Sequence, residues 1–495
     1  MHRRTFIQGG LALASTPLLA RGGEISSAGP AHWSLGWRGV TQDAFEPRAL
    51  SVTGRLPPAL QGGALYRNGP ARLERAGVRY RHWFDGDGML QRFRFGAESI
   101  VHDGRFVQTA KYREEQAADR FLYNAAGTAL AQATGGRNND SGNVANTALL
   151  PWNDELLALW EGGSAYRLDP NTLDTLGRKD WRDDLQHMPF SAHPLREHDG
   201  TLWNFGSAPY AGRSGTIFVY RIDTDGTVLE AQGIPTQVPG YLHSFAMSER
   251  HLIFYIGAHL FEHGADTFVD SFHWTADVGS RVLIVDKNDL SRQRWFEAPP
   301  GFTFHCADAW DEGEDVLMRL CLYEDASVMH SGMFALLDRS QHATPAYPEF
   351  ARATLATMRA SQRDGQLRVE STGELMEFPV TDARAAGGTS PVFGVGHGDA
   401  SNATFSNAVV RVMPQSGEVE RFVFGDQYIV EEPLFVPSGG VGEGWLVGTF
   451  LDLAKRRSGA YVLDAGRLTE GPVALAHMDR VLPLGFHGCF VSRAV

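Results

Sequence analysis

The sequence is poor in cysteine: its 495 residues include only Cys306, Cys321 and Cys489. An odd and low count excludes a disulfide framework, and we therefore interpret all three as packed thiols. Cys306 directly follows His305 and Cys489 lies two residues after His487, so each is considered as a metal ligand. Successive side chains of a strand point to opposite faces, which directs Cys306 away from any site that its neighbour faces.

Several motifs are also missing. The chain has no GxxxxGK(S/T), GxSxG or HExxH sequence, which leaves nucleotide binding and the common hydrolase mechanisms without support. The segment 85–88 lacks the third acidic ligand and the terminal glutamate of a calcium loop, and an Asp-Gly turn explains it better. The net charge is −13 and the basic residues form no stripe, so nucleic acid is not an expected partner.

Long hydrophobic runs are confined to the N-terminus. Arg3 and Arg4 precede Phe6 and an apolar run that continues to Ala20, which is the pattern of a bacterial twin-arginine export signal. The run is too short to anchor the chain in a bilayer. We predict an export signal over residues 1–28 and a soluble, periplasmic mature protein, the alternative being a frayed basic tail.

Short strands dominate the rest of the chain. Apolar runs with period-two alternation recur beyond residue 35, separated by Gly, Asp, Asn and Pro, and segments such as VYRIDTDGTVLEAQ and AYVLDAGRLTEGPVA resemble variants of one hairpin. Recurring hairpins are typical of a β-propeller, and we find no composition break, so we predict one all-β domain over residues 35–495. Helices are expected only in insertions on one face, at residues 113–134 and 347–361, and residues 135–142 are expected to form a flexible loop.

Four histidines lie in apolar, strand-like surroundings: His193 in SAHP, His243 in YLHSF, His305 in FTFHCADAW and His487 in GFHGCF. They are 50, 62 and 182 residues apart, which suggests that separate structural units each contribute one side chain to a common centre. Imidazole suits iron, copper, zinc and nickel, and four histidines would make a neutral ligand set around a divalent ion. The sequence therefore predicts a four-histidine metal centre.

The alternative is that these four are hydrogen-bonded core residues, because the chain has 18 histidines to choose from. His259 and His263 are four residues apart, but AHLFEHG lacks the glutamate arrangement of a metalloprotease helix, and we interpret both as surface or loop residues. The following histidines lie beside polar or turn residues and have no clear partner in the sequence: His187, His198, His251, His273 and His397.

The segments around the four histidines resemble those of the carotenoid cleavage oxygenase family, over about residues 35–495. ALYRNGP at 64–70 and HWFDGDGML at 82–90 are similar to the family's N-terminal signature, and the AHP, apolar-HSF, FH and GFHG motifs follow in the family's order. The resemblance implies a seven-bladed propeller with Fe(2+) on its axis. It also implies a dioxygenase that delivers both atoms of O2 across one C=C bond of a conjugated polyene, giving two carbonyl products without any further cofactor.

The family resemblance further implies three glutamates that orient histidine ligands. The matching positions are Glu161 in LALWEGG, Glu377 in LMEFPV and Glu432 in EEPLFVP. A carboxylate that accepts the distal N–H of an imidazole fixes its tautomer and raises its basicity as a ligand. Glu431 is a rival to Glu432, but only Glu432 directly precedes the matching PLFVP segment. Three glutamates leave one histidine without such a partner, and the sequence does not say which.

The choice of substrate depends on a missing lysine. Stilbene-cleaving members hold a phenolic hydroxyl with a tyrosine and a lysine that lies shortly before the ANT segment, whereas this chain reads SGNVANT with no lysine nearby. Lys111 and Tyr112 are present, without a sign that they face a cavity. We therefore favour a carotenoid or apocarotenoid over a hydroxystilbene. An apolar rim docked on a bilayer would give access to membrane carotenoids. A non-oxygenative isomerase-hydrolase and a non-catalytic binding propeller remain alternatives.

Overall fold

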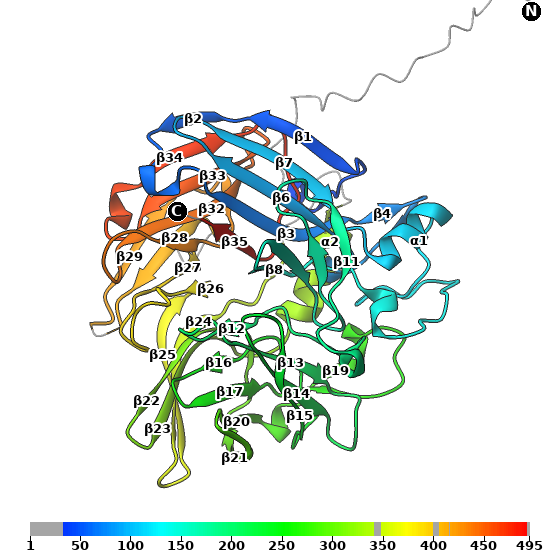
Figure 1. Cartoon of the computed structure of the whole chain (residues 1–495), viewed down its shortest axis with the longest axis vertical. Helices are drawn as coiled ribbons and strands as arrows, with labels where there is room; N and C mark the ends of the chain where they lie inside the picture. The colour runs from blue at the N-terminus through cyan, green and yellow to red at the C-terminus, as the bar shows by residue number, and fades with distance from the viewer. Residues whose placement is uncertain (1–32, 341–347, 399–404, 415, 493–495) are drawn as a thin grey trace, which may run out of the picture.

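The computed structural model describes residues 33–340, 348–398, 405–414 and 416–492. Within these residues the strands form seven antiparallel sheets of at least four strands and two short ribbons. The sheets follow one another around a common centre, from the blue N-terminal sheet through the green middle of the chain to the orange and red C-terminal part (Figure 1). The prediction of an all-β, seven-bladed propeller is confirmed.

Each blade is a separate antiparallel sheet of four or more strands. The first three contain the following strands: β1 (Ala44–Ala49), β7 (Ile100–Phe106), β6 (Asp87–Phe95), β3 (Ala64–Arg72) and β35 (Gly488–Val491); β8 (Ala148–Trp152), β9 (Glu155–Leu159), β10 (Tyr166–Leu168) and β11 (Thr175–Arg178); β12 (Leu195–Arg196), β13 (Leu202–Ala208), β14 (Thr216–Ile222) and β15 (Val228–Pro235). The next three contain β16 (Ala246–Met247), β17 (His251–Ile256), β20 (Ser280–Asp286) and β21 (Asp289–Ala298); β22 (Phe302–Glu312), β23 (Asp315–Tyr323), β24 (Thr354–Ser361) and β25 (Leu367–Leu375); β26 (Glu377–Val380), β27 (Val392–Gly396), β28 (Ala408–Val412) and β29 (Val419–Val423).

The seventh blade combines both ends of the propeller. It contains β2 (Ser51–Gly54), β34 (Pro472–His477), β33 (Arg457–Asp464), β32 (Gly444–Asp452), β30 (Tyr428–Val430) and β31 (Leu434–Pro437). The ring is closed twice: the early strand β2 pairs with β34, and the last strand β35 pairs with β3 of the first blade. The N-terminal part of the chain therefore contributes a strand to the last blade and the C-terminal part contributes one to the first, which ties the ring closed.

The hydrophobic core lies between neighbouring blades. Phe205 and Val219 of the third blade pack in one cluster with Phe254 and Leu283 of the fourth, and all four are at most 1% exposed. Each blade therefore buries its apolar faces against the next one, as the period-two alternation of the sequence requires. The stacked faces hold the innermost strands rigidly around the centre.

The helical insertions differ from the sequence prediction. Of residues 113–134 only the beginning is helical, in α1 (Ala110–Ala118), which Thr109 caps by accepting from the backbone N–H of Tyr112 and which ends at Asp119 in the left-handed conformation, φ 48°. The helix expected over 347–361 is wrong, because Thr354–Ser361 is strand β24, paired on both sides in the fifth blade. Pairing and burial overrode the helical propensity of its Ala, Leu and Met residues.

The remaining helical elements are short. They are η1 (Trp33–Trp37), η2 (Pro58–Leu60), η3 (Trp83–Asp85), η4 (Asn139–Gly142), η5 (Asp183–Leu185), η6 (Val269–Ser271), η7 (Ala276–Val278), the π-helix η8 (Val328–Gly332), α2 (Met333–Arg339) and η9 (Leu468–Glu470). The ribbons are β4 (Glu74–Arg75) with β5 (Val78–Arg79), and β18 (His259–Phe261) with β19 (Phe272–Trp274). Across the described ranges, every helix is too short or too polar to cross a bilayer. The predicted export signal, residues 1–28, lies outside these ranges and stays a prediction.

Candidate metal centre

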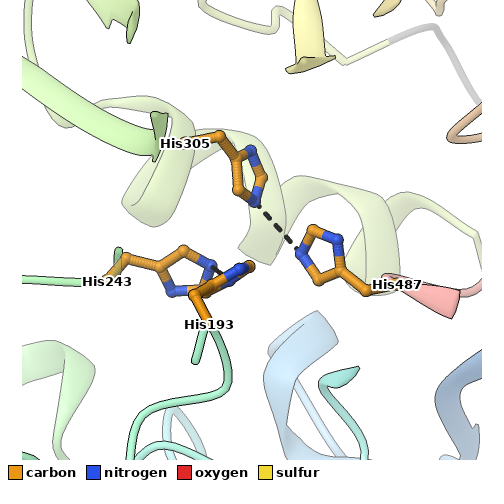
Figure 2. Close-up of side chains that lie close together, drawn as sticks. All are labelled: His193, His243, His305 and His487. Carbon is orange, nitrogen blue, oxygen red and sulfur yellow. Dashed lines mark hydrogen bonds between the residues drawn. The ribbon is translucent and has the colours of Figure 1, made fainter. Parts of the chain in front are cut away.

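The four histidines singled out in the sequence meet at the centre of the propeller. One ring nitrogen from each of His193, His243, His305 and His487 lies within 4.8 Å of the others. The four imidazoles point toward one another (Figure 2), with Nε2–Nε2 distances of 2.8 Å between His193 and His243 and 3.1 Å between His305 and His487. This convergence argues against a non-catalytic propeller with scattered core histidines.

The histidines share one structural position. His193, His243 and His487 lie one to three residues before the innermost strands β12, β16 and β35, and His305 lies near the start of β22. Neighbouring inner segments are joined by hydrogen bonds at this level. The Ser191 hydroxyl donates to the carbonyl of His243 at 3.3 Å, and the Ser244 hydroxyl donates to the carbonyl of Phe304 at 2.6 Å. These two hydrogen bonds hold the segments of His193, His243 and His305 next to one another.

Three of the histidines contact a glutamate through Nδ1. His305 Nδ1 lies 2.5 Å from Glu377 and His487 Nδ1 lies 2.8 Å from Glu432, while His243 Nδ1 is in close contact with Glu161. The structure therefore pairs each of the three glutamates with a different imidazole.

His193 is the histidine left without a glutamate contact in the described part of the chain. Its own backbone N–H donates to Ser191 Oγ at 3.1 Å.

Glu431 is separated from the imidazoles although it adjoins Glu432. Its carboxylate accepts from the Thr449 hydroxyl at 2.7 Å and from the backbone N–H of Gly485 at 2.6 Å. Glu432 instead accepts from His487 and from the backbone N–H of Gly488 at 2.9 Å. Of these two glutamates, Glu432 is the one whose carboxylate contacts an imidazole.

The tautomers follow from these contacts. A carboxylate at Nδ1 places the imidazole proton there and leaves the Nε2 lone pair directed at the centre. In the His305–His487 pair both protons are committed to Glu377 and Glu432, so two lone pairs face each other across 3.1 Å. Burial, together with His305 and His243, lowers the pKa of His487 well below its ordinary value, which disfavours a second proton on that ring. A cation between the two nitrogens relieves this repulsion.

The glutamates are stabilised in three different ways. Arg67, with only 4% of its side chain exposed, donates to Glu432 at 2.5 Å and lies 3.7 Å from Glu431. The Tyr241 hydroxyl contacts both oxygens of Glu161 at 3.1 and 3.2 Å. Glu377 accepts from the backbone N–H of its neighbour at 2.7 Å. The surroundings of the four histidines thus include four carboxylates, of which only Glu431 and Glu432 lie beside a guanidinium, and the surplus negative charge favours a cation at the centre.

Sequence reasoning missed two of these residues. Tyr241 lies two positions before His243, which puts both side chains on one face of an extended segment, so a period-two inspection could have found it. Arg67 was noted only as part of ALYRNGP, and its contact with Glu432 spans 365 residues of chain. A contact of that range has no local signal.

A large cavity adjoins the histidines, with a volume of about 460 Å³. Its walls come mainly from aromatic and aliphatic side chains of the inner strands and of the insertions, including Trp160, Tyr241, Phe304, Met333, Phe350 and Phe486. His243, His305 and His487 also line it, so a molecule in the cavity reaches the centre directly. Mostly apolar walls with few polar groups suit a hydrophobic ligand of low polarity.

Lys111 belongs to a different site. It is completely buried and pairs with Asp87 and Glu115, each at 2.8 Å, and its pKa is raised well above the usual value because these carboxylates outweigh desolvation. It is not among the residues that line the cavity, and neither is Tyr112. The Asp85–Gly88 segment forms the end of η3 and the start of β6, and its carboxylates accept from protein donors: Asp85 from Gly127 N–H and the Thr128 hydroxyl, and Asp87 from Lys111.

The structure also shows the surroundings of the other histidines. His259, interpreted as a surface or loop residue, is fully buried in β18, and its Nε2 lies 2.9 Å from Nε2 of His330 on the π-helix. His263 is exposed as expected. His187 and His251, which had no clear partner in the sequence, contact Asp140 and Asp311, both at 2.7 Å.

The cysteines are free thiols, as predicted. Cys306 lies 3.6 Å from the Ser244 hydroxyl, and burial raises its pKa to about 12. Among the described residues, the cluster that could hold a metal ion consists of the four histidines, without a cysteine.

Comparison with known proteins shows which proteins this chain is similar to. The sequence model of the family described as retinal pigment epithelial membrane protein matches residues 39–492. Apocarotenoid-15,15'-oxygenase of Synechocystis sp. is 31% identical, with 94% of this chain and 97% of the relative covered. Isoeugenol monooxygenase of Pseudomonas nitroreducens is 26% identical (92% and 96% covered), and lignostilbene-alpha,beta-dioxygenase isozyme III of Sphingomonas paucimobilis is 27% identical (89% and 92% covered).

A solved structure from the same group of proteins has a similar fold. A crystal structure of cobalt-substituted apocarotenoid oxygenase from Synechocystis superposes with a TM-score of 0.82 at 25% identity, covering 93% of this chain and 98% of that one. That relative is a metal-substituted protein, and the same fold here carries a four-histidine cluster. The chain belongs to the carotenoid cleavage oxygenase family and is an enzyme of that oxygenase class.

Proposed function

We propose that this enzyme is an Fe(2+)-dependent dioxygenase that cleaves one C=C bond of a carotenoid or apocarotenoid into two carbonyl products. The observation that carries the proposal is the His305–His487 pair, whose two Nε2 lone pairs face each other while both Nδ1 protons are bound by glutamates. His193, His243, His305 and His487 would hold the ion.

The donor set fits iron. Four neutral imidazoles leave positions open on an octahedral ion, and imidazole is a ligand that iron accepts readily. When bound, Fe(2+) supplies the activation of O2. Both oxygen atoms end in the two carbonyl groups and the cleaved double bond supplies the electrons, so no further reductant is required.

The protein's own residues would position and shield the reacting bond. Glu161, Glu377 and Glu432 orient three imidazoles, and the Tyr241 hydroxyl holds Glu161 in place. The aromatic cavity excludes water and aligns an extended apolar molecule beside the histidines. No lysine is among the described residues of the cavity wall, which supports a polyene over a hydroxystilbene.

The direct test is turnover under labelled oxygen. Iron-loaded protein is incubated with carotenoids, apocarotenals and hydroxystilbenes under 18O2, and the products are identified by mass spectrometry. The expected result is cleavage of a polyene into two aldehydes or ketones that both carry label. Products without label would support the isomerase-hydrolase alternative, and exclusive cleavage of hydroxystilbenes would support the stilbene alternative.

A paired substitution tests the role of the glutamates. Glu432→Gln keeps the shape of the side chain but weakens acceptance from His487 Nδ1, so iron affinity is expected to fall about 10–100-fold. The matched control is Glu431→Gln, the same change one residue earlier in a carboxylate that contacts no imidazole. Iron affinity is measured by competition with a chelator. Equal losses in both variants would contradict a specific role for Glu432.

A further inference from the structure

The cavity has a polar patch at its rim, between the second and third blades. Asn139 and Gly142 of η4 and Tyr210, which follows β13, all line the cavity, and Tyr210 is 41% exposed. A Cβ atom placed on Gly142 would lie 3.8 Å from the ring of Trp160. Trp160 directly precedes Glu161, whose carboxylate contacts His243, so one short segment of chain connects the rim patch to the metal centre.

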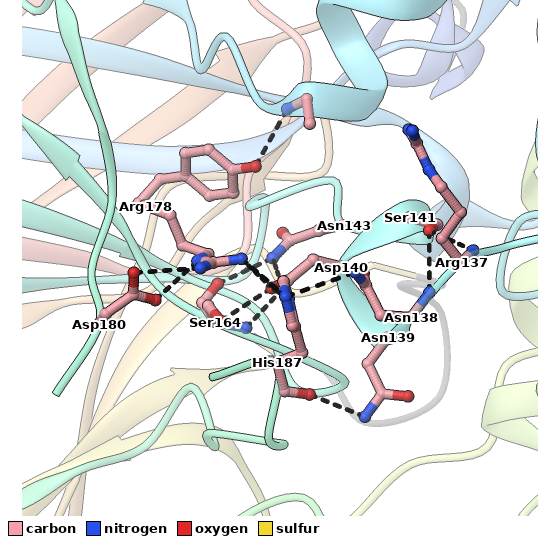
Figure 3. Close-up of polar contacts among 12 residues, drawn as sticks. Arg137, Asn138, Asn139, Asp140, Ser141, Asn143, Ser164, Arg178, Asp180 and His187 are labelled. Carbon is pink, nitrogen blue, oxygen red and sulfur yellow. Dashed lines mark hydrogen bonds and ion pairs between the residues drawn. The ribbon is translucent and has the colours of Figure 1, made fainter. Parts of the chain in front are cut away.

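A buried carboxylate holds the η4 turn in place (Figure 3). Asp140, only 5% exposed, accepts from the backbone N–H of Ser164 at 2.7 Å, from Asn143 Nδ2 at 3.0 Å and from His187 Nδ1 at 2.7 Å. Burial alone would raise the pKa of Asp140, but these donors hold it below its ordinary value. The segment 135–142, expected to be a flexible loop, is therefore anchored at this point.

His187 connects the anchor to the rim. Its backbone has φ 62°, a left-handed conformation that is uncommon for a residue other than glycine and that needs support from its surroundings. The imidazole Nδ1–H donates to Asp140 at 2.7 Å, and its Nε2 accepts from Arg178 at 3.1 Å. In this conformation the His187 carbonyl accepts from Asn139 Nδ2 at 3.0 Å. The strained bend thus positions the carboxamide of Asn139.

The His187 carbonyl also determines which way the carboxamide faces, because only the nitrogen end can donate to it. Asn139 Nδ2 lies 3.4 Å from the Tyr210 hydroxyl oxygen as well. Both amide hydrogens are then used within the protein. Among the described residues, neither Asn139 Oδ1 nor the hydroxyl hydrogen of Tyr210 has a protein partner. The rim therefore presents one acceptor and one donor side by side.

We propose that Asn139 and Tyr210 bind a hydroxyl group at the end of the substrate distal to the cleaved bond. A hydroxyl can accept from Tyr210 and donate to Asn139 Oδ1 at once, whereas an aldehyde or ether can only accept and a hydrocarbon does neither. The preferred substrate is accordingly a ring-hydroxylated polyene. This inference rests on the proposed function for the reaction, but the binding of the hydroxyl group is independent of turnover.

The test compares matched substrates on matched variants. A hydroxylated apocarotenal and its deoxy analogue are titrated into the full chain, with binding followed by quenching of tryptophan fluorescence, and kcat/KM is measured on the iron-loaded protein. Tyr210→Phe removes the hydroxyl and keeps the ring. Asn124→Leu is the control, because Asn124 lines the cavity on another segment and its amide donates to the Asp266 carbonyl.

Wild type is expected to bind and cleave the hydroxylated compound about fivefold better, a modest factor because Tyr210 is partly exposed. Tyr210→Phe should remove this preference mainly through KM, and Asn124→Leu should leave the ratio between the two compounds unchanged. No preference in wild type, or a preference that survives in Tyr210→Phe, would overturn the inference. Selective binding without cleavage would contradict the proposed function alone. A hydroxystilbene and its methyl ether, run in parallel, show whether a phenol uses the same pair.

Discussion

His305→Ala is expected to abolish iron binding and turnover together. The imidazole provides one of the four nitrogens at the centre, lies 3.1 Å from Nε2 of His487, and is the partner of Glu377. Its removal takes away a ligand and leaves the Glu377 carboxylate without its imidazole. The loss of activity should exceed the ~100-fold that follows from a change in an outer partner of a ligand. Iron per chain is measured by elemental analysis of anaerobically purified protein, and turnover by product formation.

The control for this change is His263→Ala. His263 is an exposed histidine outside the cavity, and its replacement should leave both iron content and rate unchanged. Comparable circular dichroism spectra of the two variants would separate loss of the metal from loss of the fold. Full iron content and normal turnover in His305→Ala would contradict the proposed centre.

Arg67→Met is expected to be among the most destabilising substitutions in the propeller. The guanidinium lies almost completely buried between Glu431 and Glu432 and also donates to the carbonyl of Phe486 at 3.1 Å. Its removal leaves two buried carboxylates without their cation, a change that typically costs about 3–5 kcal/mol. The urea midpoint of unfolding should fall markedly, and iron affinity should fall with it, because Glu432 no longer has a fixed position beside His487.

Two further variants make this result interpretable. Arg67→Lys keeps the charge but loses the forked geometry, so an intermediate midpoint is expected. Arg363→Met removes the same kind of side chain from an exposed pair with Glu314, where both side chains are more than half exposed, and the midpoint should barely change. Equal urea midpoints of unfolding for Arg67→Met and wild type would contradict the prediction. They would show that Glu431 and Glu432 stay buried without Arg67 at no cost in stability.

The two segments predicted as helices show where local patterns were insufficient. Residues 347–361 contain Ala, Leu and Met at helical frequency, yet Leu355 and Met358 are buried in a strand that pairs with β23 and β25. Helix propensity differs by only a few tenths of a kcal/mol between such residues, whereas two strand partners and a buried face contribute far more. The choice was made by the neighbouring strands, which a local window does not contain.

Lys111 illustrates the same limit at the level of a site. As a lysine beside a tyrosine it was a candidate for binding a phenol, but its ammonium group forms buried ion pairs with Asp87 and Glu115. His259 is a second example, since a turn-like sequence context concealed a buried ring packed on Phe272. In both cases the residue type was visible and its partners were not.

The sequence by itself determined the architecture and the identity of the central side chains. Period-two hairpins predicted the propeller, and the motifs around His193, His243, His305 and His487 marked the four imidazoles, because both signals lie within a few residues of chain. Only the tertiary structure decided which histidine lacks a glutamate, and that Arg67 and Tyr241 support two of the carboxylates. These contacts arise when seven blades close into a ring, which brings together residues hundreds of positions apart, and no local pattern encodes that closure.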